Sequence, residues 1–259
     1  MSDATAIDVD FSVEGPPNAP VLVLSGSLGS TRAMWQPQVD ALSADLRVVT
    51  YDARGHGASP VPVGPYTIAD FGADLLRLLD RLDVERAHVA GLSLGGMTGM
   101  WTAAHAPERV DRLVLLCTSA LLGPPEGWAQ RAETVTAAGS SDAVAGAVVT
   151  RWFTDGYAKA HPEAVARMRD MIAATPPAGY AASCRAIETM DLRPDLPRIT
   201  APTLVLAGAQ DPATPPAHLR AIAEAIPGSR LETVDPGAHL ASWESAGTVN
   251  ALLRSHLLE

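Results

Sequence analysis

The chain has 259 residues, of which 47% are hydrophobic and 19% are charged, which suffices for one well-buried α/β domain with an insertion but is short for two full domains. Its formal net charge of -10 repels a phosphate backbone, so nucleic acid is excluded as a partner. No apolar run approaches the roughly 18 residues that would span a bilayer, and residues 1–10 lack the basic and apolar regions of a secretory signal, so we expect a soluble protein that is not exported and does not bind membranes.

The first predicted strand covers residues 21–24, Val-Leu-Val-Leu, and ends in a loop of small residues at 25–30, Ser-Gly-Ser-Leu-Gly-Ser. This short apolar run is typical of a buried parallel strand. Ligand sites in open α/β sheets form at the carboxyl ends of the strands, so the loop is a candidate to supply an oxyanion donor, the backbone N–H of Leu28. The alternative is an ordinary turn between a strand and a helix.

A polar segment, Asp-Ala-Arg-Gly-His-Gly at residues 52–57, follows a predicted helix at 34–42 and a predicted strand at 46–51. Its aspartate, arginine and histidine can be interpreted as a site. The glycines on either side of His56 instead fit a tight, hydrogen-bonded turn. We therefore favour a structural role for His56.

A helix is predicted over residues 68–82, where apolar residues recur at the i, i+3, i+4 spacing of a core-facing helix. Three charged residues of this helix, Asp74, Arg77 and Asp80, are expected on its solvated face. The apolar positions are Phe71, Leu75, Leu78, Leu79 and Leu82.

The rest of the chain is organised around residues 87–101, whose pattern is typical of a strand, a sharp turn and a helix. Gly91 and Gly95 remove the Cβ atoms that would keep strand and helix apart, so Ser93 can sit strained and exposed at the turn. A helix that starts just after Ser93 directs free N–H groups and the positive end of its dipole at any oxyanion beside the serine. We predict Ser93 as the nucleophile and the N–H of Leu94 as an oxyanion donor.

Beyond a strand predicted at 110–117, residues 120–197 contain successive helical segments with no strand pattern among them. This change predicts a helical cap inserted between two strands of the sheet, where it would exclude water and shape the pocket. The chain is therefore divided into a core, residues 1–119 and 198–259, and a cap, residues 120–197. The core pattern resumes with a strand at 203–208, a helix at 218–226, a strand at 230–234 and a final helix at 245–258.

A serine nucleophile needs a base within hydrogen-bond reach and an acid that fixes the tautomer of that base. Of the seven histidines, only His239 both follows a strand of the resumed pattern and lies in a Gly-rich loop. Asp211 follows the preceding strand, so its carboxylate should stand at the same sheet edge as Ser93. Asp235 is the rival acid, but it is too close to His239 along the chain to face it easily. We predict a catalytic triad of Ser93, Asp211 and His239.

Together these segments resemble the α/β-hydrolase superfamily over almost the whole chain and, within it, are most similar to the 3-oxoadipate enol-lactonases. The superfamily likeness lies in residues 52–59, 91–97, 210–212 and 237–240. The narrower likeness lies in residues 27–29, 34–35, 104–110, 151–154, 179–181, 186–187 and 211–216. One departure is Ser-Trp-Glu-Ser-Ala at 242–246, where these enzymes usually carry a Glu-Gln-Pro stretch.

The resemblance implies an α/β-hydrolase fold, which is an α/β architecture with a mostly parallel central sheet flanked by helices and a helical cap insertion. It also implies a cytoplasmic serine hydrolase that opens the ring of 3-oxoadipate enol-lactone in the β-ketoadipate pathway of aromatic catabolism. The substrate would be a small anionic lactone or ester, and the reaction needs no metal and no organic cofactor. Cys117 and Cys184 have no metal-ligand spacing, and formation of a homo-oligomer is left open.

Other activities use the same triad. Carboxylesterase, C–C bond hydrolase and cofactor-free perhydrolase are the alternatives within the fold. A non-catalytic ligand-binding protein on this fold is the alternative of a different class, and it would bind its ligand with little turnover.

The carboxylate of such a substrate needs a bidentate cation. Arg131 is favoured for this role because Trp128 precedes it by about one helical turn, so the pair could present a cation and an aromatic wall to one pocket. Trp35 and Trp152 are further candidates for the wall, with core packing as the alternative for each. The predicted cap supplies five arginines as candidates, Arg131, Arg151, Arg167, Arg169 and Arg185.

Overall fold

Seven strands form one sheet in the order β1-β3-β2-β4-β5-β6-β7 in the computed structural model, which describes residues 5–258. Residues 1–4 and 259 lie outside the described residues. They are the two ends of the predicted core, and residues 1–4 also begin the segment 1–10, for which the sequence predicts no secretory signal. All strand pairs are parallel except β1 with β3, which confirms the predicted mostly parallel sheet. The strands are β1 Phe11–Glu14, β2 Val21–Ser25, β3 Arg47–Tyr51, β4 Ala87–Leu92, β5 Val110–Leu116, β6 Thr203–Gly208 and β7 Arg230–Val234.

The edge strand β1 was not predicted. It has four residues, of which three are only half-buried, and it pairs antiparallel with β3 so that Phe11 faces Tyr51. A strand this short at the edge of a sheet carries neither a continuous apolar run nor a long alternation.

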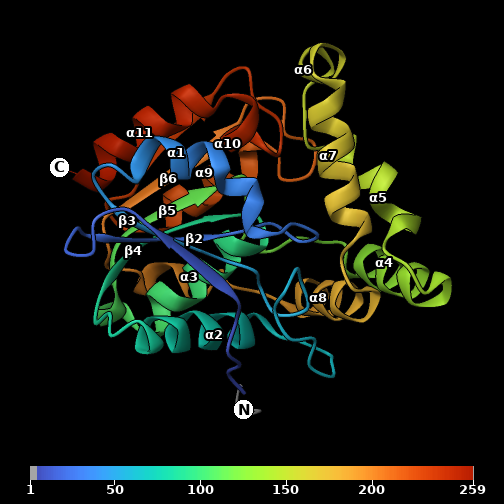
Figure 1. The fold of residues 1–259 in the computed structure, drawn as a ribbon, viewed down its shortest axis with the longest axis horizontal. Helices are drawn as coiled ribbons and strands as arrows, with labels where there is room; N and C mark the ends of the chain where they lie inside the picture. The colour runs from blue at the N-terminus through green and yellow to red at the C-terminus, as the bar shows by residue number, and fades with distance from the viewer. Residues whose placement is uncertain (1–4, 259) are drawn as a thin grey trace.

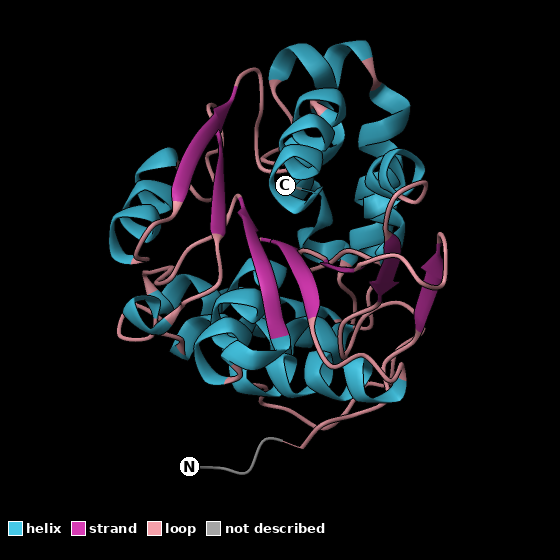
Figure 2. Ribbon diagram, turned by 90° about the vertical axis from the view of Figure 1, so that its left-hand side faces the viewer, coloured by secondary structure: helices cyan, strands magenta, loops and turns pink. Residues whose placement is uncertain are grey.

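Helices cover both faces of the sheet (Figure 1). On one face α1 (Gln36–Leu42) contacts α11 (Ala246–Leu258), and on the other α2 (Ile68–Arg81) packs along α3 (Leu94–His105). Figure 2 shows the strands twisting across the molecule between these helices. The remaining core elements are α9 (Pro216–Ala225), α10 (Ala241–Glu244) and the 3-10 turns η1 (Arg32–Trp35), η2 (Pro107–Arg109) and η3 (Leu196–Arg198).

Two predicted helices start elsewhere than expected. The helix expected from residue 34 opens as the 3-10 turn η1 and becomes α-helical only at Gln36. Helix α9 begins at Pro216 rather than at residue 218, because proline is well tolerated in the first turn, where its missing N–H would have no helical partner.

Five helices lie between β5 and β6, with no strand among them: α4 (Pro125–Ala138), α5 (Asp142–Val149), α6 (Asp155–Ala160), α7 (Pro162–Ala173) and α8 (Pro177–Thr189). We call residues 120–197 the five-helix segment. It forms a separate group at the right of Figure 1, beside the sheet and its flanking helices. Helix α4 packs along α8, and α5 packs along α7.

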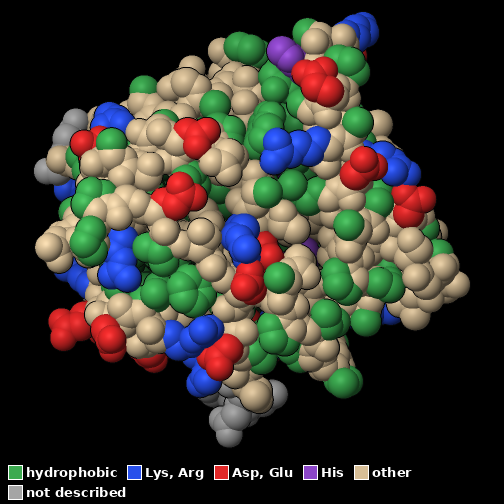
Figure 3. All heavy atoms as spheres, in the orientation of Figure 1, with side chains coloured by type: hydrophobic (Ala, Val, Ile, Leu, Met, Phe, Trp, Pro, Cys, Tyr) green, Lys and Arg blue, Asp and Glu red, His purple; other side chains and the backbone are tan. Residues whose placement is uncertain are grey.

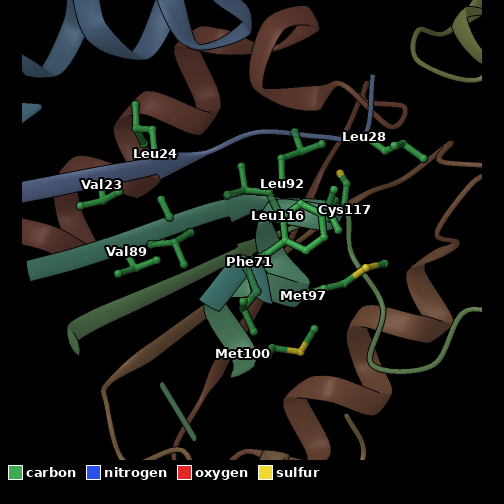
Figure 4. Close-up of a cluster of buried hydrophobic side chains, with 14 of the residues drawn as sticks. Val23, Leu24, Leu28, Phe71, Val89, Leu92, Met97, Met100, Leu116 and Cys117 are labelled. Carbon is green, nitrogen blue, oxygen red and sulfur yellow. The ribbon is translucent and has the colours of Figure 1, made fainter. Parts of the chain in front are cut away.

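The hydrophobic core joins the central strands to α2 and α3. Figure 4 shows side chains of β2, β4 and β5 packing around Met97 and Met100 of α3 and Phe71 of α2. The predicted core face of α2 is buried from Phe71 to Leu79, whereas Leu82 is only partly buried.

One charged residue of α2 was predicted wrongly. Arg77 and Asp80 are exposed, but the Asp74 side chain is only 1% exposed, because its two oxygens accept hydrogen bonds from Nε and Nη2 of Arg54, each at 2.7 Å. The bidentate pairing offsets part of the desolvation of the carboxylate, whose pKa burial still raises. Helical periodicity predicted the buried apolar face of α2, but it could not predict that Arg54 pairs with Asp74.

The outer surface carries both signs of charge. Basic and acidic side chains are interspersed over the face seen in Figure 3. Within residues 5–258 no helix is both long and apolar enough to cross a membrane.

Candidate active site

Ser93 occupies the turn between β4 and α3 with φ 55° and ψ -114°, a left-handed conformation that is strained for a residue other than glycine. Both the backbone N–H and the backbone carbonyl of Ser93 are hydrogen-bonded to the chain that follows β4 in the sheet. The N–H donates to the carbonyl of Leu116 at 3.1 Å, and the carbonyl accepts from Oγ1 of Thr118 at 2.7 Å. These bonds fix the direction in which the Ser93 side chain leaves the turn.

Glycine is required on both sides of this serine. A Cβ on Gly91 would overlap the carbonyl oxygen of Gly95, and one on Gly95 would overlap the carbonyl oxygen of Ser25 in β2. Strand β4, helix α3 and the end of β2 therefore meet at backbone distance, as the Gly-x-Ser-x-Gly spacing predicted.

The backbone N–H of Leu28, which lines the same cavity as Ser93, and that of Leu94, which directly follows Ser93, have no acceptor within residues 5–258. In the loop after β2, the N–H of Ser27 faces Sδ of Met34 at 3.3 Å and that of Gly29 donates to Nε2 of His56 at 3.0 Å. Leu94 is the first residue of α3, where an N–H has no helical partner. Because buried N–H groups are rarely left unpaired, these two are suited to hold an anionic oxygen.

His239 follows β7 and pairs with Asp211, which follows β6. Nδ1 of His239 lies 2.9 Å from Oδ2 of Asp211, and their side chains are 5% and 0% exposed. The other carboxylate oxygen accepts the backbone N–H groups of Ala213 and Thr214 at 2.8 and 3.1 Å. With Nδ1–H directed at Asp211, Nε2 of His239 is the ring nitrogen left to accept a proton.

The Asp211 carboxyl is held in its ionised form. Burial alone would raise its pKa, but the charge of His239 and hydrogen bonds from His239 and Thr214 outweigh burial and keep the pKa of Asp211 below its ordinary value. The rival Asp235 is exposed and accepts from Nε2 of Gln210 at 2.7 Å. The structure thus brings Asp211, and not Asp235, to His239.

One cavity of about 300 Å³ connects the strand ends to the five-helix segment. Ser93, His239 and Leu28 line it from the core, and Trp128, Arg131, Arg151, Trp152 and Tyr180 line it from the five-helix segment. Every predicted site residue except Leu94 and the buried Asp211 and Trp35 therefore faces the same space.

Trp35 lies elsewhere. Its side chain is fully buried in the hydrophobic cluster under α1 and is not part of the cavity lining. For Trp35 the structure therefore confirms core packing, the alternative to a place in the cavity wall. Trp152, by contrast, lines the cavity although most of its surface is buried.

The predicted pair of Arg131 and Trp128 stands in the cavity wall. The guanidinium carbon of Arg131 lies 4.4 Å from the centre of the Trp128 ring, whose Nε1 donates to the carbonyl of Leu122 at 2.8 Å. Arg151, which the sequence did not single out, shares the wall, and burial together with the charge of Arg131 lowers its pKa. Neither arginine has a carboxylate partner within residues 5–258, so both remain available to an anion.

Residues that could bind a metal are not gathered here. Within the described chain no three His, Cys, Asp or Glu side chains are placed to hold a metal ion. Cys117 and Cys184 are unpaired and buried. The polar groups at or beside this cavity are Ser93, the His239–Asp211 pair, the free N–H groups of Leu28 and Leu94, and two arginines.

The family model described as the alpha/beta hydrolase fold matches residues 19–246. The chain belongs to the α/β-hydrolase family. Among curated proteins, this α/β-hydrolase is 40% identical over 248 residues to 3-oxoadipate enol-lactonase 2 of Acinetobacter baylyi, a match that covers 95% of this chain and 92% of that protein.

Solved structures of other α/β-hydrolases superpose on it closely. The enol-lactonase from Burkholderia xenovorans LB400 gives a TM-score of 0.94 with 42% identity, covering 97% of this chain and 96% of the other. A hydrolase from Pseudomonas aeruginosa PA01 gives 0.93 with 44% identity, covering 96% and 94%. The resemblance to enol-lactonases expected from the sequence is confirmed, and the likeness extends through the five-helix segment.

Proposed function

We propose that this α/β-hydrolase is a 3-oxoadipate enol-lactonase, which opens the lactone ring to give 3-oxoadipate in aromatic catabolism through the β-ketoadipate pathway. One observation carries the proposal. Two arginines without carboxylate partners line the same cavity as Ser93 and His239, which suits an ester that bears a free carboxylate. The similarity to named enol-lactonases over 95% of the chain supports the same substrate.

Ser93 would act as the nucleophile. Its Oγ attacks the ring carbonyl carbon while Nε2 of His239 takes the proton, and Asp211 steadies the resulting imidazolium through Nδ1. The negative oxygen of the tetrahedral intermediate is held between the N–H groups of Leu28 and Leu94. Collapse breaks the ring C–O bond and leaves an acyl-enzyme.

The leaving group makes this step easier than ordinary ester cleavage. An enol is a better leaving group than an alkoxide, and His239 returns the proton to it before the enol tautomerises to the ketone. Water, deprotonated by His239, then attacks the acyl carbon, and the bond to Ser93 Oγ breaks as His239 returns the proton to Oγ, which releases the second carboxylate and restores the free serine. Ser93, His239 and Asp211 thus each act in both the acylation and the deacylation step of one turnover.

The five-helix segment would serve as the cap, with residues 1–119 and 198–259 as the core. It contributes Trp128, Arg131 and Arg151 to the cavity, opposite Ser93. In this arrangement the cap binds the substrate carboxylate and excludes water, while the core performs acyl transfer. We also propose, from the resemblance, that the enzyme works in the cytoplasm.

The test is the loss of ultraviolet absorbance of 3-oxoadipate enol-lactone, generated in situ, measured with wild type and Ser93→Ala side by side. We expect rapid loss with the wild type and none above background with the variant. If the wild type leaves the lactone intact but hydrolyses aryl esters through Ser93, the enzyme is a carboxylesterase instead. If it turns over neither, a non-catalytic binding protein is favoured.

A further inference from the structure

His56 is a buried histidine outside the cavity that bridges two backbone segments. Its Nε2 lies 3.0 Å from the N–H nitrogen of Gly29, in the loop after β2, and its Nδ1 lies 3.0 Å from the carbonyl oxygen of Arg54. The side chain is fully buried. Both ring nitrogens are therefore used within the protein.

These two contacts determine the proton on the ring. A backbone N–H can only donate, so Nε2 must accept from Gly29 and carries no proton. A carbonyl can only accept, so Nδ1 must carry the proton that bonds to Arg54. The imidazole is neutral in one defined tautomer, and in agreement burial lowers the pKa of His56.

The bond to Gly29 acts on the loop that carries Leu28. Gly29 N–H belongs to the peptide group directly after Leu28, so holding it restrains one of the two peptide planes that flank the Leu28 Cα and leaves only the φ and ψ of Leu28 between that plane and the one that bears the Leu28 N–H. Ser27 and Ser30 are held on either side by Sδ of Met34, at 3.3 Å from the Ser27 nitrogen and 2.9 Å from the Ser30 hydroxyl. Between them, Leu28 lines the cavity, and its N–H has no acceptor among the described residues.

The same turn also contacts the five-helix segment. A Cβ on Gly179 of α8 would overlap the carbonyl oxygen of Gly55, next to His56, so α8 and the turn meet backbone to backbone. A Cβ on Gly29 would in turn come within 3.1 Å of the ring of Tyr180. Helix α8, the turn around His56 and the loop of Leu28 thus form one packed junction.

We propose that His56 is a positioning residue for the oxyanion hole: as a neutral acceptor for Gly29 N–H, it holds Leu28 N–H in the direction that stabilises the tetrahedral intermediate. This inference rests on the proposed function, because it concerns the charge that develops when Ser93 attacks. It assigns His56 no contact with substrate. The effect should therefore appear in the transition state and not in substrate binding.

Three substitutions separate the two bonds of the ring. His56→Leu removes both. His56→Asn places an amide near the position of Nδ1 and keeps only the contact with Arg54, whereas His56→Gln reaches the position of Nε2 and offers its carbonyl to Gly29 N–H. His88→Leu is the matched control, because His88 is also buried but lies in the lining of a separate cavity with Arg86 and Asp111.

The readouts are kcat and KM for the enol-lactone, and the inhibition constant of phenylboronic acid, whose tetrahedral adduct with a serine carries a negative charge at the oxyanion position. For His56→Leu and His56→Asn we expect kcat to fall about 10²- to 10³-fold, by analogy with the loss of one oxyanion donor, with KM within about twofold and boronate affinity falling in parallel. His56→Gln should recover most of the kcat, and His88→Leu should keep wild-type kcat.

Several results would overturn the proposal. These are a wild-type kcat in folded His56→Asn, a loss confined to KM, or a His56→Gln as impaired as His56→Asn. If His56→Leu does not fold, the comparison of Asn with Gln still decides. A wild type inactive toward both lactone and aryl esters contradicts the proposed function itself, whereas an active wild type with unimpaired His56 variants contradicts only the positioning role.

Discussion

Nδ1 of His239 lies 2.9 Å from Oδ2 of Asp211, and neither side chain has more than 5% of its surface exposed. Each residue follows the end of one of two adjacent parallel strands, β6 and β7. The relationship therefore depends on strand pairing rather than on proximity in the chain, where the two residues are 28 positions apart.

Asp211→Asn should lower kcat about 10³- to 10⁴-fold with little change in KM, because the amide no longer selects the tautomer of His239 or stabilises its charge. Asp235→Asn is the matched control, since it alters an aspartate after the neighbouring strand that bonds only to Gln210 among the described residues. Steady-state kinetics on the enol-lactone measures both. Equal losses in the two variants would contradict the assignment of Asp211.

Gly95→Ala should destabilise the protein by about 3 kcal/mol and abolish activity, because the new Cβ would overlap the carbonyl of Ser25 and force α3 away from β2. Gly146→Ala is the control within helix α5, where a Cβ meets nothing within 4 Å. That variant should gain about 0.4–1 kcal/mol. Urea unfolding distinguishes the two, and a Gly95→Ala as stable as wild type would refute the close packing at this turn.

Arg131→Met and Arg151→Met should each lower kcat/KM for the anionic lactone, by an amount set by the loss of a charged hydrogen bond, about 1.5–3 kcal/mol or roughly 10- to 150-fold. The loss should appear mainly in KM and should vanish with an uncharged aryl ester. Arg167→Met removes the same charge from the five-helix segment at a residue that stacks on Trp243 outside the cavity lining. If all three variants behave alike, long-range attraction rather than a local carboxylate site explains the binding.

His56→Gln should flatten the dependence of stability on pH. Burial lowers the pKa of His56 in the folded protein below the ordinary 6.5 of the unfolded chain. As pH falls below 6.5 the unfolded chain takes up a proton that the folded protein does not, so wild type loses up to about 1.4 kcal/mol per pH unit from this group until the folded pKa is reached. His56 therefore makes the wild type less stable as the pH falls.

The measurement is the free energy of urea unfolding at pH 7.5, 6.5 and 5.5. Between pH 7.5 and pH 5.5, the free energy of unfolding of His56→Gln should fall by less than that of the wild type. His88→Gln gives an independent second comparison, because burial also lowers the pKa of His88. Slopes identical to wild type in both variants would show that these imidazoles bind protons equally in the folded and unfolded states, which contradicts a lowered pKa for either group.

The turn at Ser93 could be predicted because its requirements are local. Two glycines at fixed spacing, a preceding apolar run and a following helix specify the geometry within about a dozen residues. The order of serine, acid and base along the chain then located Asp211 and His239. Those positions need only the rule that parallel strands end at one edge of the sheet.

Contacts between distant segments could not be predicted in the same way. Trp35 and Trp152 look alike in the sequence, yet one packs in the core and the other lines the cavity. Asp74 occupies a helical position that was expected to be solvated, yet it is buried, and its carboxylate accepts hydrogen bonds from Arg54, 20 residues earlier, and from the N–H of Ile7. The bond from His56 to Gly29 likewise joins two turns 27 residues apart.

The placement of β6 and β7 after the five-helix segment has a consequence for protein synthesis. A nascent chain emerges from the ribosome with Ser93, Leu28, Leu94 and both cavity arginines already made, while the strands that carry Asp211 and His239 are still untranslated. The central strands and the helices can begin to fold during this interval. The proposed hydrolase therefore gains the acid and base that activate Ser93 only when β6 pairs with β5 and β7 pairs with β6.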